Sequence, residues 1–182
     1  MKSGRRLPGG SFSIAFRQLR VRQWIKNLLV FAPFIFAGHG NFWAVFWGFW
    51  CFCLVSSSVY ILNDIADEKS DRFLKKDRPL ANREITPQFA GLLCFILGVM
   101  WTVWGLNLNL LFGFILLFYF LINSLYSLGF KDYGLVGAFM VTFGYVLRVI
   151  GGGLLAGVII SSWILVHVSA VRAGISIVSV VI

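Results

Sequence analysis

Residues 27–63 read NLLVFAPFIFAGHGNFWAVFWGFWCFCLVSSSVYILN, which is 37 consecutive positions without an Asp, Glu, Lys or Arg. A helix needs about 20 mainly apolar residues to cross a bilayer. The Gly38-His39-Gly40-Asn41 turn divides the stretch into two helices. Four of the chain's seven acids then follow within eight positions, from Asp64 to Asp71. The stretch therefore predicts membrane helices that end at a strongly polar segment.

Two further apolar runs extend this pattern to the rest of the chain. Residues 85–130 contain 46 positions without a charged side chain, and residues 149–171 contain 23. Only 13% of the residues are charged, whereas a soluble domain carries roughly 25%. We predict an all-α, multipass transmembrane helical bundle. Its expected helices cover residues 25–38, 42–63, 88–106, 108–126, 135–157 and 161–181.

The sixteen basic residues are unevenly distributed, and their positions predict how the chain is oriented. Seven lie in residues 1–26 and six in residues 64–87, whereas the turns on the opposite side of the predicted bundle contain none. Cytoplasmic loops of membrane proteins carry the excess of Lys and Arg. We therefore predict an integral protein of the cell (inner) membrane, with the N-terminus and the loops 64–87 and 127–134 in the cytoplasm.

The same pattern divides the chain into two parts. We expect residues 1–24 to form a basic cytoplasmic or interfacial N-terminus and residues 25–182 to form the transmembrane domain. The formal net charge of +9 follows from this asymmetry and favours attraction to anionic lipid head groups. No segment is typical of a soluble nucleic-acid-binding module. The expected partners thus include the lipid bilayer and no nucleic acid.

The acidic segment has the spacing of a metal site. Asn63, Asp67 and Asp71 are four residues apart, and Asp64 lies three before Asp67. If the second helix continues past the membrane surface, these groups share one face. Carboxylates at that spacing repel one another unless a cation lies between them. Mg²⁺ takes oxygen ligands and commonly combines one or two carboxylates with substrate phosphates, so Mg²⁺ is the natural candidate for a cation on this face.

The spacing also fits a solvated helix end. Glu68 with Arg72, and Asp71 with Lys75, are four residues apart and can form ordinary salt bridges. Spacing alone leaves the two interpretations open. The following stretch KKDRPLANREI, residues 75–85, places phosphate-binding charge beside the acids and favours a Mg²⁺–pyrophosphate site. Its basic residues are Lys75, Lys76, Arg78 and Arg83.

Two more polar features lie in apolar surroundings. A cluster after the fourth predicted helix is expected on the same cytoplasmic side, where it can complete the site. Arg148 lies deep in the fifth apolar segment, where a charge costs about 3 kcal/mol or more unless it faces protein or a polar cavity. We predict that Arg148 faces inward and contacts an anion, and that Gly151–Gly153 allow close helix packing. The cluster consists of Asn123, Tyr126, Ser127, Lys131 and Asp132.

These residues resemble the UbiA superfamily of intramembrane prenyltransferases. Its first signature, Asn-xxx-Asp-xxx-Asp after the second helix, is matched by Asn63, Asp67 and Asp71. Within the superfamily the chain is most similar to the decaprenyl-phosphate phosphoribosyltransferases. The matching segments are LRVRQWIKNLLVFAPFIFA at 19–37, YILNDIADEKSDR at 60–72, RPLA at 78–81, NSLYSLGFK at 123–131 and GYVLRVIGGGLLAGV at 144–158.

The resemblance implies a bundle of nine spans, of which about six are present, with a cytoplasmic active-site mouth. Mg²⁺ held by the three signature residues is expected to bind the pyrophosphate of phosphoribosyl pyrophosphate. The phosphate of a polyprenyl phosphate then attacks the ribose C1, as in cell-wall arabinan precursor synthesis. Whether the chain forms a homo-oligomer is left open. The substrate-binding residues expected from the resemblance and the polar clusters are Lys26, Asp64, Arg78, Tyr126, Lys131 and Arg148.

The chain departs from the family pattern in two places. The second family motif has an Asp six residues after the position of Lys131, where this chain has Gly137, and Asp132 is displaced from it by five residues. The last residues lack the family's basic cytoplasmic loop, so we expect a truncation, or a frameshift near Val166. Two alternatives follow: an aromatic prenyltransferase of UbiA type that uses a prenyl pyrophosphate, and an inactive truncated membrane paralogue.

Overall fold

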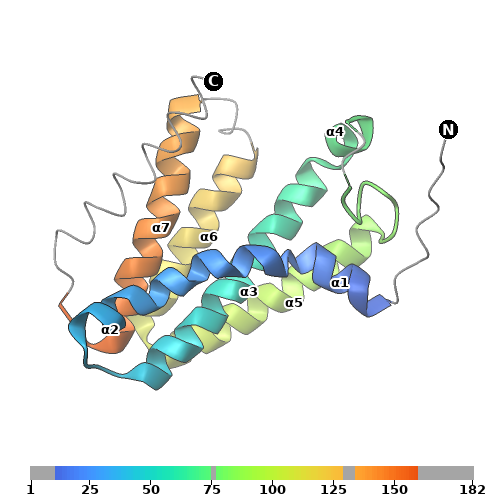
Figure 1. Ribbon diagram of the computed structural model, residues 1–182. Helices are drawn as coiled ribbons and strands as arrows, with labels where there is room; N and C mark the ends of the chain where they lie inside the picture. The colour runs from blue at the N-terminus through green and yellow to red at the C-terminus, as the bar shows by residue number, and fades with distance from the viewer. Residues whose placement is uncertain (1–10, 75–76, 129–133, 160–182) are drawn as a thin grey trace.

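The computed structural model describes residues 11–74, 77–128 and 134–159, and in these ranges the chain is helical without strands (Figure 1). The prediction of an all-α bundle is confirmed. In chain order the elements are α1 (Ser11–Leu19), the 3₁₀ helix η1 (Val21–Phe31), α2 (Ala32–Ala37), α3 (Phe42–Ala66), α4 (Glu68–Phe73), α5 (Pro87–Leu108), α6 (Leu110–Leu128) and α7 (Gly134–Ala156).

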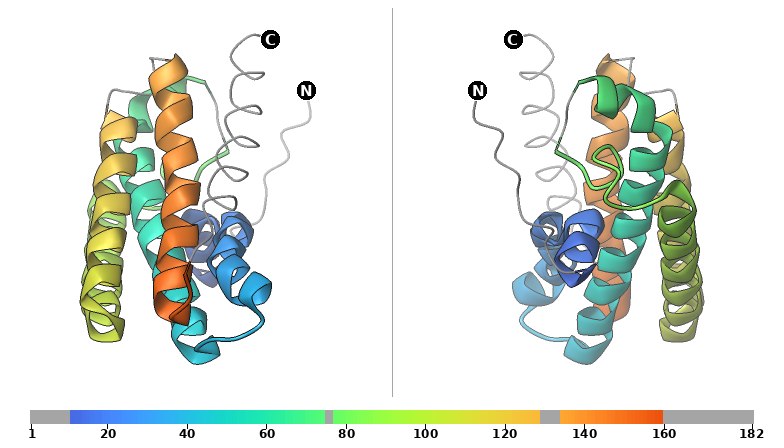
Figure 2. Two further views of the ribbon diagram at one scale, coloured as in Figure 1. Left: turned by 90° about the vertical axis from the view of Figure 1, so that its left-hand side faces the viewer. Right: turned by 90° about the vertical axis from the view of Figure 1, so that its right-hand side faces the viewer.

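The four long helices α3, α5, α6 and α7 alternate in direction, and the N-terminal helices lie across them (Figure 1). η1 packs on α3 and α7, and α2 packs on α7. The end of α3, α4, the end of α6 and the start of α7 lie together at one end of the bundle (Figures 1 and 2). The polar segments recognised in the sequence therefore gather at that end.

The predicted membrane helices agree with the structure to within a few residues for α3, α5, α6 and α7. Three of these helices, α3, α5 and α6, are long and apolar enough to cross a bilayer, and α7 contains an apolar stretch at Thr142–Ala156. The helix expected at 25–38 instead begins at Val21 and consists of η1 and α2, so the boundary predicted after residue 24 falls inside η1. The helix expected at 161–181 lies outside the described residues.

Short polar side chains begin the long helices, as their sequence positions suggest. The Asn41 side chain accepts a hydrogen bond from the Ala44 N–H (3.1 Å), and the Thr86 hydroxyl accepts one from the Phe89 N–H (3.2 Å). These bonds satisfy amide groups that have no partner inside the helix. Gly38, with φ 70°, ends α2 in the left-handed conformation that glycine adopts most readily.

The helices approach closely where the glycine run of α7 meets η1. A Cβ atom added to Gly152 would lie 2.0 Å from the Val30 carbonyl oxygen, and one added to Gly151 would lie 3.0 Å from the Phe112 ring. Neither position has room for a larger side chain, which confirms that this run allows close packing. The same contact holds η1 against α7 beside Arg148, so the core of the bundle positions the site described next.

Candidate anion-binding site

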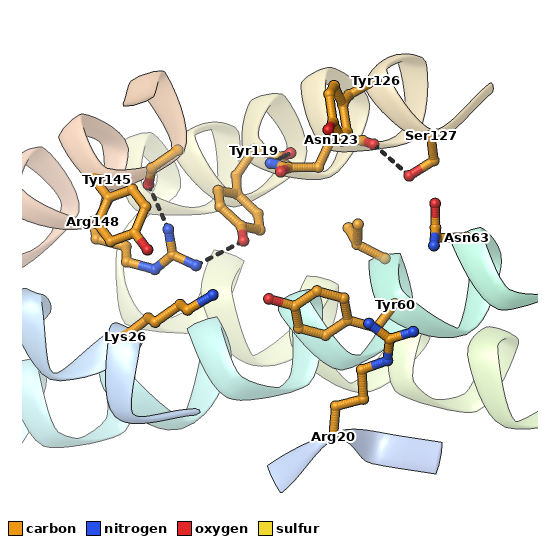
Figure 3. Close-up of a pocket in the computed structure, with 12 residues that line it drawn as sticks. Arg20, Lys26, Tyr60, Asn63, Tyr119, Asn123, Tyr126, Ser127, Tyr145 and Arg148 are labelled. Atoms are coloured by element: carbon orange, nitrogen blue, oxygen red, sulfur yellow. Dashed lines mark hydrogen bonds between the residues drawn. The ribbon is translucent and has the colours of Figure 1, made fainter. Parts of the chain in front are cut away.

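A cavity of about 280 Å³ lies between η1, α3, α6 and α7. Its walls come from the last turns of α3, the second half of α6 and the middle of α7, together with the N-terminal helical segment (Figure 3). Of the lining residues that the structure describes, three are cationic, none is acidic, and Val59 is the one aliphatic residue. The lining residues are Arg20, Lys26, Val59, Tyr60, Asn63, Tyr119, Asn123, Tyr126, Ser127, Gly144, Tyr145 and Arg148.

Arg148 is the most deeply placed charge of the cavity, with 4% of its surface exposed. Its three nitrogens donate to the Asn27 side-chain oxygen (2.7 Å), the Gly144 carbonyl (2.8 Å) and the Tyr119 hydroxyl (2.8 Å). Its guanidinium also lies 4.8 Å from the centre of the Tyr119 ring and 5.2 Å from that of Tyr145. Uncharged groups from η1, α6 and α7 thus fix the guanidinium, as expected for an inward-facing arginine.

Asn27 connects the cavity to the core. It is fully buried, and its amide nitrogen donates to the Ser56 hydroxyl (3.2 Å) while its oxygen accepts from Arg148. Its neighbour Lys26 points into the cavity from η1, and Tyr60 points into the same space from α3 (Figure 3). Two cations and two tyrosines, Tyr60 and Tyr119, therefore converge at this end of the cavity.

The other end of the cavity carries amide and hydroxyl groups. Asn63, Asn123, Tyr126 and Ser127 line it (Figure 3). The Ser127 hydroxyl donates to the Asn123 carbonyl (3.0 Å), and the Asn123 amide donates to the Tyr119 carbonyl (2.8 Å). The structure thus brings three members of the predicted second cluster to the same cavity as Asn63, Lys26 and Arg148. The remaining members, Lys131 and Asp132, lie outside the described residues.

The acidic segment lies beside the cavity, and its carboxylates contact arginines. Asp64 is 2% exposed; its Oδ1 accepts from Arg20 (2.5 Å) and from Arg78 Nη1 (3.0 Å), and its Oδ2 accepts from Gln18 (3.2 Å). Asp71 is also buried, and its Oδ2 accepts from the same Arg78 nitrogen. Asp64, expected to bind substrate, is therefore not among the cavity-lining residues.

The helix that carries the acids is interrupted. α3 ends at Ala66, Asp67 has φ −91° and ψ 2°, and α4 begins at Glu68. Hydrogen bonds from the Asp67 N–H to the Asn63 carbonyl (2.9 Å) and from the Asp71 N–H to the Asp67 carbonyl (2.8 Å) keep helical spacing across the break. Within the described ranges no group of three or more His, Cys, Asp or Glu side chains is placed to hold a metal ion.

The salt bridges expected of a solvated helix end are partly present. Arg72 donates to Glu68 (2.5 Å), as the alternative interpretation predicted. The pairing of Asp71 with Lys75 cannot be compared, because Lys75 lies outside the described residues. The Arg78 contacts with Asp64 and Asp71 are of a different kind, since both carboxylates are buried. The buried part of the segment is therefore not simply a solvated helix end.

The loop after α4 is fastened to the N-terminal helices. Arg17 of α1 binds Glu84 (2.9 Å) and Asp77 (3.0 Å). Arg20, which follows α1, has φ 51° and ψ 46°, a left-handed conformation that costs a non-glycine residue about 1–3 kcal/mol and needs support from its surroundings. Its guanidinium lies 5.1 Å from the centre of the Tyr60 ring and binds Asp64. This conformation brings Arg20 to the wall of the cavity.

Several cavity residues were not selected from the sequence. Four of the five tyrosines of the chain line the cavity. The chain has 19 phenylalanines, so its few tyrosines stand out in the sequence. They could have been selected as site residues, because a tyrosine in a membrane helix needs a partner for its hydroxyl. Arg20 had no local signal, since its role depends on contacts with residues about 40 positions away. The residues missed are Arg20, Tyr60, Tyr119 and Tyr145.

The fold and the cavity together define a helical membrane protein with a polar cavity lined by three cationic side chains. The comparisons identify its family. A profile of the UbiA prenyltransferase family matches residues 28–180, and the chain belongs to this family.

The relatives include two enzymes of the same name. The chain is 33% identical over 170 residues to the decaprenyl-phosphate phosphoribosyltransferase of Mycolicibacterium smegmatis, covering 87% of this chain and 53% of the relative. It is 31% identical over 161 residues to the enzyme of Mycobacterium tuberculosis, covering 82% of this chain and 53% of the relative. The chain thus spans about half the length of these relatives.

A solved structure has a similar fold. It is a UbiA homolog from Archaeoglobus fulgidus bound to GPP and Mg²⁺, with a TM-score of 0.76 and 20% identity over 88% of this chain and 60% of the homolog. At this identity the likeness concerns the fold, and it agrees with the bundle predicted from the sequence.

Proposed function

We propose that this chain carries the donor site of a transferase that moves a phosphoribosyl group from phosphoribosyl pyrophosphate to a polyprenyl phosphate. The lining of the cavity carries the proposal. It combines three cations with hydroxyl and amide groups, and its twelve described residues include no acid. A phosphorylated sugar needs hydrogen-bonding groups for its hydroxyls and positive charge for its phosphates.

The rival donor is a prenyl pyrophosphate, as in an aromatic prenyltransferase. Such a donor carries a hydrocarbon chain directly on its pyrophosphate and needs an apolar wall around that chain. Among the described residues of the cavity lining Val59 is the one aliphatic residue, and this favours the sugar donor. The names of the two mycobacterial relatives favour it too. The prenyl pyrophosphate donor is favoured by the homolog from Archaeoglobus fulgidus, which is bound to GPP.

The residues at the acidic segment fit a divalent metal. Backbone bonds keep helical spacing from Asn63 through Asp67 to Asp71, Asp71 Oδ2 already contacts a cation, Arg78, and Asn63 lines the adjoining cavity. All these groups offer oxygen, which Mg²⁺ prefers. We propose Asn63, Asp67 and Asp71 as its ligands. Bound Mg²⁺ would neutralise the charge that develops on the departing pyrophosphate.

The remaining residues bind and orient two anions. Lys26, Arg78, Lys131 and Arg148 are the proposed phosphate contacts, and Tyr126 is a proposed substrate contact at the polar end. In the reaction an oxygen of the polyprenyl phosphate forms a bond to the ribose C1 while the bond from C1 to the pyrophosphate oxygen breaks. The protein contributes alignment and charge neutralisation, with no covalent step of its own.

The proposed setting is the cell (inner) membrane. The cavity lies at the end of the bundle to which the basic loops belong, so the positive-inside rule places it at the cytoplasmic surface. Phosphoribosyl pyrophosphate would reach it from the cytoplasm and the polyprenyl phosphate from the bilayer. A role in cell-wall arabinan precursor synthesis follows from the mycobacterial likeness.

An assay with both donors tests the proposal. The purified chain in lipid nanodiscs is supplied with Mg²⁺, a polyprenyl phosphate and either labelled phosphoribosyl pyrophosphate or labelled prenyl pyrophosphate with an aromatic acceptor. We expect turnover of the first donor. Turnover of the second donor alone would overturn the proposal in favour of an aromatic prenyltransferase. Turnover of neither would favour an inactive paralogue.

A further inference from the structure

The arginines around the cavity differ in whether a carboxylate neutralises their charge. At the acidic segment Arg20 and Arg78 contact the carboxylates of Asp64 and Asp71. Arg148 is instead bonded to Asn27, Gly144 and Tyr119, which are all uncharged. Among the described residues no carboxylate is paired with it. A buried cation whose partners are neutral is costly, and an anion from outside the chain would offset that cost.

The bonds of Arg148 leave a suitable pair of donors. A guanidinium has five N–H groups, two on each terminal nitrogen and one on Nε. In the bonds to described residues one N–H of each nitrogen is used, so within this part of the chain each terminal nitrogen retains another. Two such donors match two oxygens of one phosphate. Lys26 adds a second positive charge at this end of the cavity (Figure 3).

This end is distinct from the end beside the proposed metal. Asn63 and Ser127 line the cavity next to the acidic segment, whereas Lys26, Tyr119 and Arg148 lie at the opposite end (Figure 3). A diphosphate bound with Mg²⁺ near Asn63 would leave the basic end for another anionic group. Each end of the cavity therefore suits one anionic group, supplied either by two separate anions or by one molecule with two separated phosphates.

We propose that Lys26, Tyr119 and Arg148 form a metal-independent site for a phosphate monoester, separate from the metal-dependent diphosphate end. The inference rests on the proposed function for the identity of the ligand. Both substrates carry a suitable group: phosphoribosyl pyrophosphate has a monoester phosphate on C5 of the ribose, and polyprenyl phosphate is itself a monoester. A prenyl pyrophosphate has none. The site thus selects for phosphorylated sugars or lipid monophosphates.

The test measures binding to the full chain in nanodiscs by isothermal titration calorimetry, with EDTA present. The two probes are ribose 5-phosphate and farnesyl monophosphate, which separate the donor from the lipid as the source of the phosphate. We expect at least one probe to bind without metal. Arg148→Gln and Lys26→Gln should each weaken that binding tenfold or more, and Arg148→Lys should weaken it less because it keeps the charge.

The matched control is Glu68→Gln, which alters the acidic segment at a residue paired with Arg72 and leaves the basic end intact. It should keep the metal-free binding of the monoester within twofold. Because Arg148→Gln removes three buried hydrogen bonds, its fold is checked by thermal melting. Lys26, which is only partly buried, gives the second variant if Arg148→Gln does not fold.

Each outcome decides a point. Metal-free binding that is lost in Lys26→Gln and kept in Glu68→Gln supports the site, and the probe that binds identifies the source. Binding of neither probe overturns the inference, as does equal binding in all variants. In that case Mg²⁺-dependent binding of phosphoribosyl pyrophosphate would still support the proposed function. Binding of geranyl pyrophosphate in its place would overturn that function separately.

Discussion

Asp71 and Arg78 are bound to each other, although the sequence assigns one to a metal and the other to a phosphate. Arg78 Nη1 contacts Asp71 Oδ2 and lies 3.0 Å from Asp64 Oδ1. The guanidinium thus occupies a point where two buried carboxylates converge, which is where a cation is expected. The two assigned roles are compatible if binding of the metal and the donor breaks this ion pair. Asp71 then contacts the metal, and Arg78 contacts a phosphate of the donor.

This relationship predicts an unusual result for Arg78→Gln. Removing a positive charge that competes for Asp71 should tighten metal binding in the absence of donor. The same change removes a phosphate contact, so donor affinity should fall about tenfold or more, since hydrogen bonds to charged groups contribute about 1.5–3 kcal/mol. Mn²⁺ titration followed by electron paramagnetic resonance measures the first effect, and calorimetry with phosphoribosyl pyrophosphate measures the second.

Arg17→Gln is the matched control for that variant. Arg17 fastens the same loop through Asp77 and Glu84, yet no bond joins it to Asp71. Its pairs are partly exposed, and such pairs contribute about 0–1 kcal/mol. Mn²⁺ affinity should therefore stay at the wild-type value. If Arg17→Gln tightened Mn²⁺ binding as much as Arg78→Gln, release of the loop rather than loss of the competing charge would be the cause.

Local sequence signals predicted the helices well because their causes are local. Hydropathy and the turn at Gly38–Asn41 place the long helices within a few residues. Arg148 was recognised for a similar reason, since a charge in an apolar segment needs a buried partner. The partners themselves, Asn27 and Tyr119, are 121 and 29 residues away, and no local pattern predicts which polar groups will meet.

The acidic segment shows the limit of spacing arguments. The interval of four residues correctly predicted helical spacing from Asn63 to Asp71, which the backbone bonds preserve. It did not predict the break at Asp67 or the contact of Asp64 with Arg20. That contact depends on the left-handed backbone of Arg20, a conformation that is common for glycine and rare for arginine. Tertiary contacts, not the local sequence, determine it.

Asp67→Asn tests whether the acidic segment binds a catalytic metal. The substitution removes one negative charge from the proposed Mg²⁺ site, so we expect phosphoribosyl transfer to become undetectable and EDTA to have the same effect on the wild type. Product formation from labelled donor measures both. Glu68→Gln is the control: Glu68 pairs with Arg72, it is no proposed ligand, and its variant should retain most of the activity. Wild-type rates in Asp67→Asn would mean that the acids only end a helix.

Tyr119→Phe removes a single hydroxyl from the basic end of the cavity. The ring still packs against Phe52, whose ring centre is 5.7 Å away, but Arg148 Nη2 loses its acceptor. The free energy of unfolding should fall by about 1–3 kcal/mol, the usual cost of an unsatisfied buried group. Substrate affinity should fall severalfold because the guanidinium is less well oriented. An unchanged affinity in calorimetry would show that Asn27 and Gly144 suffice to hold Arg148.

Gly152→Ala tests the contact that holds η1 against α7. The added methyl group would lie 2.0 Å from the Val30 carbonyl oxygen, so the two helices must separate, and overpacking of this kind costs about 1–3 kcal/mol. Thermal melting followed by tryptophan fluorescence should show a lower midpoint. Gly98→Ala on α5 is the control: its Cβ would meet nothing within 4 Å, and alanine favours a helix over glycine by about 0.5–1 kcal/mol. It should melt at or above the wild-type temperature. Because Asn27 lies one turn before Val30 on η1, Gly152→Ala should also weaken anion binding, and Gly98→Ala should not.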